Sequence, residues 1–260
     1  NHLGDQTHRY SSIRLWGSIG FIVAVAGLGA LFEQAGTALL PSVLLVLLAA
    51  IWLSSLLVPE SAAGHQALNE EPLRKVLRQP AVVSLLLVCF LLQASHGPYY
   101  TFYSLYMVDH GYSETAIGQL WALGVVAEIA VFLKMHHWLP RFGARNLMLA
   151  AAALTALRWL LIALFVDQVW IMAFAQTLHA ASFGVYHAVS IHLIHHLFTG
   201  RHQGRGQALY SSLSFGAGGA AGSLLAGYMW DGIGAQWTYI LAAATAVLAG
   251  WIAWRGVERV

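Results

Sequence analysis

Three ionisable side chains lie well inside long apolar stretches of this sequence: Glu128, Arg158 and His179. In lipid, a charged side chain at the centre of a helix costs roughly 2.5 kcal/mol or more, so each of these residues needs a partner or a function. Glu128 is the only acid in the middle of such a stretch, which makes it the candidate for a group that binds and releases a proton. The alternative is a structural carboxylate, paired permanently with Arg158 or another cation.

Arg158 and His179 are the side chains that could work with this acid. Arg158 stands beside Trp159, and because an unpaired guanidinium is implausible in lipid, we expect Glu128 or a bound anion to be its partner. His179 could relay a proton, since histidine changes its protonation near neutral pH. A histidine hydrogen-bonded only for packing is the alternative. We predict that Glu128, Arg158 and His179 form the proton-coupling group.

A further cation, Arg14, stands at the head of the first apolar stretch. No other charge follows it as far as Leu31. A cation held in hydrocarbon is expected to serve a partner or a ligand. The alternative is an interfacial arginine whose long side chain reaches back to the lipid headgroups.

Aromatic and polar side chains gather around His96-Gly97-Pro98. Proline removes a backbone hydrogen bond, so we expect a kinked or loosened helix at this point. Tyr99, Tyr103 and Tyr106 share one face at helical spacing. Rings with polar tips suit an aromatic or sugar ligand, as does Trp121, although a packed aromatic seam would give the same pattern.

Composition places these residues in a membrane protein. Of the 260 residues, 58% are hydrophobic and 9% are charged, whereas soluble domains carry roughly 25% charged residues. The net charge of +2 is small and the basic residues do not cluster, so nucleic acid is not an expected partner. Eight windows have the length a helix needs to cross a bilayer, and we predict an all-α bundle with spans at 11–33, 37–58, 81–107, 115–138, 146–166, 169–197, 206–230 and 236–254.

Lys and Arg fall at alternate ends of these spans. The basic residues in question are Arg9, Arg74, Lys75, Arg78, Arg141, Arg145, Arg201, Arg205, Arg255 and Arg259. The opposite connections contain acids and no Lys or Arg. Positive charge marks the cytoplasmic side, so we predict a multi-pass inner-membrane protein with both ends of the segment in the cytoplasm.

The longest polar segment divides the chain. We assign 1–58 to the last two helices of one bundle, 59–79 to a cytoplasmic linker and 80–260 to a six-helix bundle. Within the linker, the stretch from Leu73 to Leu77 predicts a short surface helix, with a plain tether as the alternative.

The sequence also contains an internal repeat. The motif Tyr10-Ser11-Ser12-Ile13 returns as Tyr210-Ser211-Ser212-Leu213, and a Gly-rich stretch follows each copy. This repeat indicates two parallel halves, of which the first lacks four helices. Since the sequence begins with Asn1, we expect that it starts inside a longer protein.

Several motifs resemble those of a known superfamily. The loop from His137 to Asn146 resembles the signature loop of major facilitator transporters. Four other stretches look like the branch that contains phenylpropionate permeases and, further off, lactose permease and nucleoside–proton symporters: 10–21, 96–103, 124–128 and 176–179. This resemblance covers essentially the whole chain and implies helices five to twelve of a twelve-helix fold.

The similarity to lactose permease carries over residue by residue. It places Arg14 at a sugar-contacting arginine, Ser18 and Phe21 at two further cavity positions, and Glu128 about one turn from a sugar-binding acid. It matches Arg158 and His179 to the binding and proton-coupling network. The residues expected to bind substrate are Arg14, Ser18, Phe21, His96, Tyr99, Tyr100, Tyr103, Trp121 and Glu128.

Other positions depart from lactose permease. Ser182 stands where that family has its proton-carrying carboxylate, Phe215 or a neighbouring glycine where it has a lysine, and Gly97 and Tyr100 where it has paired acids. These differences argue against lactose-like sugar chemistry, and they move proton coupling to Glu128.

We therefore expect a secondary active transporter, a proton symporter for a small organic solute such as the aromatic carboxylate phenylpropionate. A nucleoside or oligosaccharide symporter is the alternative within transport, and a non-transporting membrane sensor or assembly module the alternative outside it. An enzyme is not expected, since no HExxH-type pair or nucleophile–base set lies in a span. His192, His195 and His196 lie about a helical turn apart, but no acid or cysteine joins them, so no metal or cofactor is predicted. The expected partners are the solute, protons and the bilayer, with the protein acting as a monomer together with its missing helices.

Overall fold

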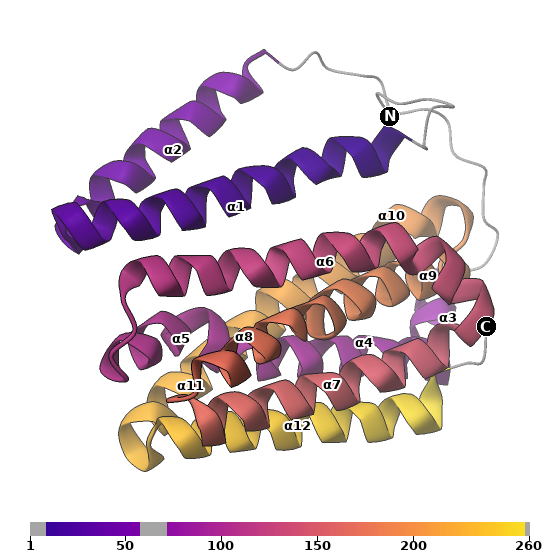
Figure 1. The fold of residues 1–260 in the computed structure, drawn as a ribbon. Helices are drawn as coiled ribbons and strands as arrows, with labels where there is room; N and C mark the ends of the chain where they lie inside the picture. The colour runs from indigo at the N-terminus through magenta and orange to yellow at the C-terminus, as the bar shows by residue number, and fades with distance from the viewer. Residues whose placement is uncertain (1–8, 58–71, 258–260) are drawn as a thin grey trace. The chain divides into compact units, whose positions relative to one another are not determined.

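The computed structural model describes residues 9–57 and 72–257, with the side chains of 9–16, 18 and 201 left aside, and these residues form helices without a strand. In chain order the α-helices are α1 (Arg9–Ala35), α2 (Leu40–Ser55), α3 (Leu73–Leu77), α4 (Pro80–Ser95), α5 (Gly97–Asp109), α6 (Glu114–Phe142), α7 (Ala144–Phe165), α8 (Val169–Thr177), α9 (Tyr186–Leu197), α10 (Gln203–Ser211), α11 (Gly219–Ile233) and α12 (Ala235–Gly256). Two π-helical segments, η2 (Ala180–Val185) and η4 (Ser212–Gly218), join α8 to α9 and α10 to α11. Figure 1 follows this order.

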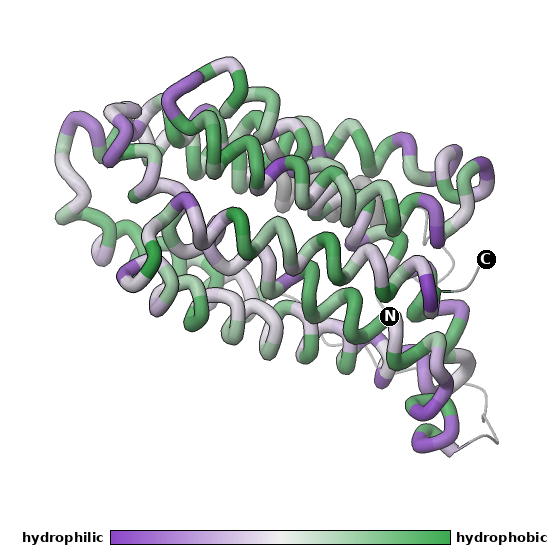
Figure 2. Tube along the Cα trace, turned by 90° about the horizontal axis from the view of Figure 1, so that it is seen from below, coloured by the Kyte–Doolittle hydropathy of each residue, from purple (hydrophilic) through white to green (hydrophobic). Residues whose placement is uncertain are grey.

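Five stretches are long and apolar enough to cross a membrane: Thr37–Ser55, Pro80–Asp109, Glu114–Phe142, Ala144–Phe165 and Ala235–Gly256. They match five of the eight expected spans. The remaining windows are also helical, although η2 and η4 interrupt two of them and α1 contributes a shorter apolar part, Ile19–Ala35. Figure 2 shows that the helices are mostly hydrophobic. That all eight cross the bilayer stays a prediction.

The chain forms two compact units. The first consists of Asn1–Gln66 with Tyr112–Ala122 and includes α1, α2 and the start of α6. Within it, α1 lies so close to α6 that a Cβ atom on Gly29 would come within 2.7 Å of the Glu114 carbonyl oxygen. The Glu33 carboxylate accepts a hydrogen bond of 3.0 Å from the backbone N–H of Thr115. These contacts fix α1 against the start of α6.

The second unit consists of Ala67–Gly111 with Leu123–Val260. Here α7 and α12 pack side by side and antiparallel, because Arg145 at the start of α7 contacts Trp254 at the end of α12. The start of α4 meets the same end of α12, where Ser84 lies against Gly256. The expected short helix is present as α3, directly before α4. The first part of the linker, 59–71, lies outside the described residues.

A kinked or loosened helix is expected around Gly97-Pro98, and the structure interrupts the helix there. His96 lies between α4 and α5, and its N–H bonds to the Gln93 carbonyl three residues back. Next to this break the backbones of two helices meet: a Cβ atom on Gly97 would overlap the backbone of Gly222 in α11, and one on Gly222 would overlap Ala94. Only glycine permits such an approach, so α11 lies directly against the α4–α5 junction.

Candidate functional site

Arg158 is the centre of a buried polar cluster in the second unit. It lies in the middle of α7 and has no solvent-exposed surface. Its Nη2 donates to Gln176 Oε1 at 3.0 Å, and its Nη1 donates to Ser182 Oγ at 3.0 Å. The guanidinium carbon also lies 4.1 Å from the centre of the Tyr99 ring, a cation–π distance. Helices α5, α7 and α8 and the segment η2 all contribute to holding this charge.

His179 connects Arg158 to Glu128. Its Nδ1 lies 3.1 Å from Arg158 Nη1, and its Nε2 lies 3.3 Å from Glu128 Oε2. A guanidinium can only donate hydrogen bonds, so Nδ1 must be the acceptor. The proton of the neutral imidazole then sits on Nε2, the nitrogen that faces the Glu128 carboxylate. The arrangement joins a cation, a neutral imidazole of fixed tautomer and a carboxylate in one line of contacts.

Local backbone structure brings these groups together. Gln176, His179 and Ser182 follow one another at three-residue spacing through the end of α8 and into η2, so they share a face. Ser182 N–H and Ala181 N–H both donate to the Leu178 carbonyl at the passage from α8 into η2. Two glycines allow α6 to approach: a Cβ atom on Gly124 would be 3.3 Å from that of His179, and one on Gly184 would be 3.2 Å from Glu128 Cγ.

A second polar group lies at the end of α4. The break at His96 frees the Leu92 carbonyl, which accepts Ser95 Oγ at 2.6 Å and contacts His96 Nδ1 at 2.7 Å. A carbonyl only accepts, so His96 carries its proton on Nδ1. Its Nε2 is then a buried acceptor without a hydrogen-bond partner among the described residues. Trp159 Nε1 donates to Ser95 Oγ at 3.2 Å and connects this group to α7.

The tyrosines of α5 divide between the interior and the surface. Tyr99 and Tyr103 are fully buried, their ring centres are 4.9 Å apart, and the Tyr99 hydroxyl donates to Gln176 Oε1 at 2.9 Å. Tyr100 is 45% exposed. Tyr99 is therefore a partner of the Arg158 cluster in this structure, and the buried rings resemble a packed aromatic seam more than an open cavity wall.

The remaining predicted substrate-binding residues belong to the first unit. Phe21 is an exposed residue of α1, and Trp121, in α6, is partly buried. The predictions on Arg14 and Ser18 lie outside the described side chains.

The sequence indicated Glu128, Arg158 and His179, and the structure brings these three together. Two residues that hold Arg158 were not assigned to the site, namely Gln176 and Ser182. Their spacing of three residues from His179, in an otherwise apolar run, is the signal that could have found them.

Comparison with known proteins agrees with this arrangement of helices. Residues 1–241 match the MFS_1-like family. Over 248 residues the chain is 30% identical to the "Probable 3-phenylpropionic acid transporter" of Escherichia coli (strain K12), an alignment that covers 92% of this chain and 64% of the relative. It is 28% identical over 231 residues to the "Maltose permease" of Geobacillus stearothermophilus, covering 88% of this chain and 58% of that one.

The chain thus spans less than two thirds of the length of these relatives. A family match over nearly the whole chain, together with a relative at 30% identity, nevertheless identifies the family of this chain. The chain belongs to the MFS_1-like family of membrane transporters, in the phenylpropionate permease-like branch of the major facilitator superfamily.

Proposed function

We propose that the full-length protein is a proton symporter for a small organic anion, an aromatic carboxylate such as phenylpropionate. The observation that carries this proposal is the buried line from Glu128 through His179 to Arg158. A symporter needs one group that is protonated on one side of the membrane and deprotonated on the other. Glu128 is 7% exposed, so water reaches it only slightly in this state, and a conformational change can alter that access.

The charges of the cluster explain how a proton and an anion become coupled. When Glu128 is ionised, its negative charge balances the positive charge of Arg158, and His179 stays neutral. Protonation of Glu128 leaves one positive charge buried without a counter-ion, which is strongly unfavourable. An anionic substrate restores the balance, so proton and anion each favour the binding of the other. A neutral substrate offers no such compensation, which is why we favour a carboxylate.

The proposal divides recognition from coupling. Both Nη atoms of Arg158 already donate to protein groups, and its Nε is buried without a hydrogen-bond partner among the described residues, so we assign Arg158 to coupling through its charge. The substrate carboxylate supplies the negative charge that balances Arg158, and Arg14, Ser18, Phe21 and Trp121 are assigned to further substrate contacts. His96, Tyr99, Tyr100 and Tyr103 are assigned to the aromatic part; Tyr100 is exposed in this state, whereas the other three are buried and would meet the substrate only after a conformational change.

The proposal includes the architecture around this cluster. Eight of twelve helices would lie in the present chain, in a protein that works as a monomer in the inner membrane with both ends of this segment cytoplasmic. Each substrate passage would require a rocking motion of two helical halves. The name of the Escherichia coli relative supports the choice of phenylpropionate.

A neutral oligosaccharide or nucleoside is the second candidate, and the similarity to a maltose permease favours the oligosaccharide. Uptake of radiolabelled phenylpropionate by proteoliposomes separates the two. Competition by benzoate-type anions and not by maltose supports the proposal, whereas the reverse pattern supports the sugar. A membrane sensor or assembly module would show no uptake of either solute.

The coupling role is tested with Glu128→Gln in the full-length protein. We expect this variant to lose accumulation of substrate against a gradient while it keeps exchange of labelled for unlabelled substrate, because an amide cannot cycle a proton. Asp167→Asn is the matched control, since Asp167 is an exposed carboxylate between α7 and α8. Unchanged proton-driven accumulation in Glu128→Gln would refute the role of Glu128.

A further inference from the structure

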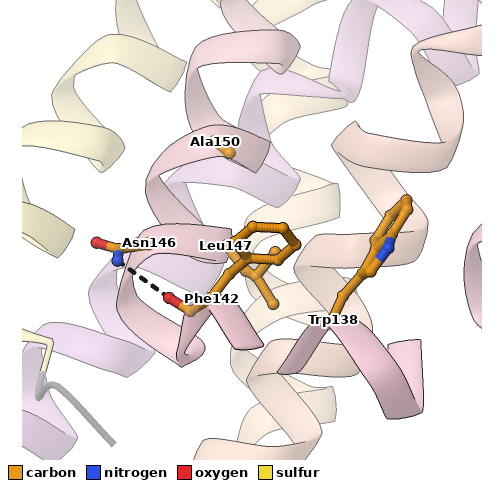
Figure 3. A pocket seen from close by; sticks show the side chains of 5 residues that line it. All are labelled: Trp138, Phe142, Asn146, Leu147 and Ala150. Carbon is orange, nitrogen blue, oxygen red and sulfur yellow. Dashed lines mark hydrogen bonds between the residues drawn. The ribbon is translucent and has the colours of Figure 1, made fainter. Parts of the chain in front are cut away.

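An apolar groove of about 390 Å³ lies between the end of α6 and the start of α7. Trp138 and Phe142 of α6 and Asn146, Leu147 and Ala150 of α7 line it (Figure 3). Phe142 is half-exposed, so the groove opens to the surroundings of the bundle. Asn146 Nδ2 donates to the Phe142 carbonyl at 3.0 Å, so this amide bonds to the backbone at the end of α6. A volume of this size falls in the range of about 300–1,000 Å³ that is usual for ligand sites.

Basic side chains surround the outer end of this groove. The guanidinium carbon of Arg141 lies 5.3 Å from the centre of the Phe142 ring, at the edge of the lining. Arg145, in the first turn of α7, donates to the Trp254 carbonyl, which brings the end of α12, with Arg255, to the same end of the bundle. Among the described residues, the acids of this unit other than Glu128 are Asp109, Asp167 and Asp231, all at the opposite ends of helices. The positive charge near the groove is thus not neutralised by a described carboxylate.

We propose that this groove binds an anionic phospholipid, with an acyl chain against Trp138, Phe142 and Leu147 and the phosphate against Arg141. Three observations support this occupant. The lining is apolar and lies on helices long and apolar enough to cross a membrane. A tryptophan and arginines at a helix end are typical of the level of the lipid headgroups. Arginines that no described carboxylate neutralises favour an anionic over a zwitterionic headgroup, because basic residues near a membrane surface attract anionic lipid.

Quenching of tryptophan fluorescence by brominated lipids tests this site. The full-length protein is reconstituted in bilayers that contain dibrominated phosphatidylglycerol or dibrominated phosphatidylcholine. The signal of Trp138 is the difference between the wild-type protein and Trp138→Phe. From the quenching of Trp138 we expect the groove to bind phosphatidylglycerol about fivefold more strongly than phosphatidylcholine. This is the factor that one basic residue contributes near a lipid surface.

Two variants decide whether that preference belongs to the groove. Arg141→Gln should remove the preference for phosphatidylglycerol at Trp138, whereas Arg255→Gln, at the same end but stacked on Trp251 and Trp254, should keep it. Trp170, an exposed residue at the start of α8, should show equal quenching by both lipids. Equal quenching at Trp138, or a preference that survives Arg141→Gln or is lost equally in Arg255→Gln, would overturn the proposal and indicate bulk lipid only.

Discussion

Arginine occurs in two contrasting environments in the second unit. Arg158 lies in the middle of α7 without exposed surface, and it is held by Gln176, Ser182, His179 and the ring of Tyr99. Arg255, at the end of α12, is exposed and lies over the rings of Trp251 and Trp254. Arg158 is thus enclosed by hydrogen-bonding groups and an aromatic ring, whereas Arg255 contacts aromatic rings and stays exposed.

The difference shows what a buried charge requires. Water and lipid headgroups can solvate Arg255, so its partners are optional. Arg158 has no such solvent, and its direct side-chain partners are neutral, so its counter-charge lies one residue further, on Glu128. The comparison therefore predicts large effects where the buried network is cut and small ones at the helix ends.

The largest effect is expected from Arg158→Met. Removing one member of a buried charged pair typically costs about 3–5 kcal/mol, because the other charge is left uncompensated. The free energy of unfolding in detergent measures this loss. The double variant Arg158→Met/Glu128→Gln should recover part of it, since the remaining carboxylate is gone. A loss no larger than that of Arg255→Gln would contradict the comparison.

A smaller effect is expected from His179→Gln. The amide can still accept a hydrogen bond from Arg158, but it cannot span the two contacts of 3.1 Å and 3.3 Å with the geometry of an imidazole. We expect a loss of about 1–3 kcal/mol in unfolding free energy, the usual cost of an unsatisfied buried polar group. Accumulation of substrate should fall with it. Full accumulation at a reduced stability would show that His179 is structural and that Glu128 exchanges its proton without it.

Tyr99→Phe removes one hydroxyl from the same cluster. Gln176 Oε1 loses the bond that the Tyr99 hydroxyl donates and keeps its bond from Arg158 Nη2. Hydrogen bonds between helices in membranes contribute about 0.6 kcal/mol on average and about 1.7 at most, and the unfolding free energy should fall within that range. A greater loss would mean that the Tyr99 hydroxyl orients Gln176 for Arg158.

The smallest effect is expected from Arg255→Gln. Exposed cation–π contacts are worth about 0.5–1 kcal/mol, and solvent replaces most of what is lost. Thermal unfolding in detergent should shift by no more than the scatter between preparations. A shift as large as that of Tyr99→Phe would show that the helix ends hold the bundle together more than their exposure suggests.

The helices could be predicted because lipid leaves few choices. Apolar windows of the right length match the helices within a few residues, and the Gly97-Pro98 pair indicated the break that the structure places at His96. The π segments η2 and η4 could not be predicted in this way. A π-helical turn rotates the following residues around the helix axis by only part of a turn. A run of uniformly apolar residues has no periodic pattern in which this rotation would be visible.

The three ionisable residues of the site were predictable because each is costly in lipid. The contacts that connect these residues could not be predicted from the sequence. We expected a possible direct partnership of Glu128 with Arg158, whereas His179 stands between them. That bridge depends on the close approach of α6 at Gly124 and Gly184, which follows from three-dimensional packing and not from the spacing of the charged residues.

The backbone contact between Gly97 and Gly222 has a consequence for motion. Two glycines that touch main chain to main chain leave no side chains that could slide or change rotamer between the helices. We expect helix α11 and the α4–α5 junction to stay in contact during motion, because their backbones touch over a short stretch without intervening side chains. Labels placed on these two segments should then keep a constant separation while others change theirs.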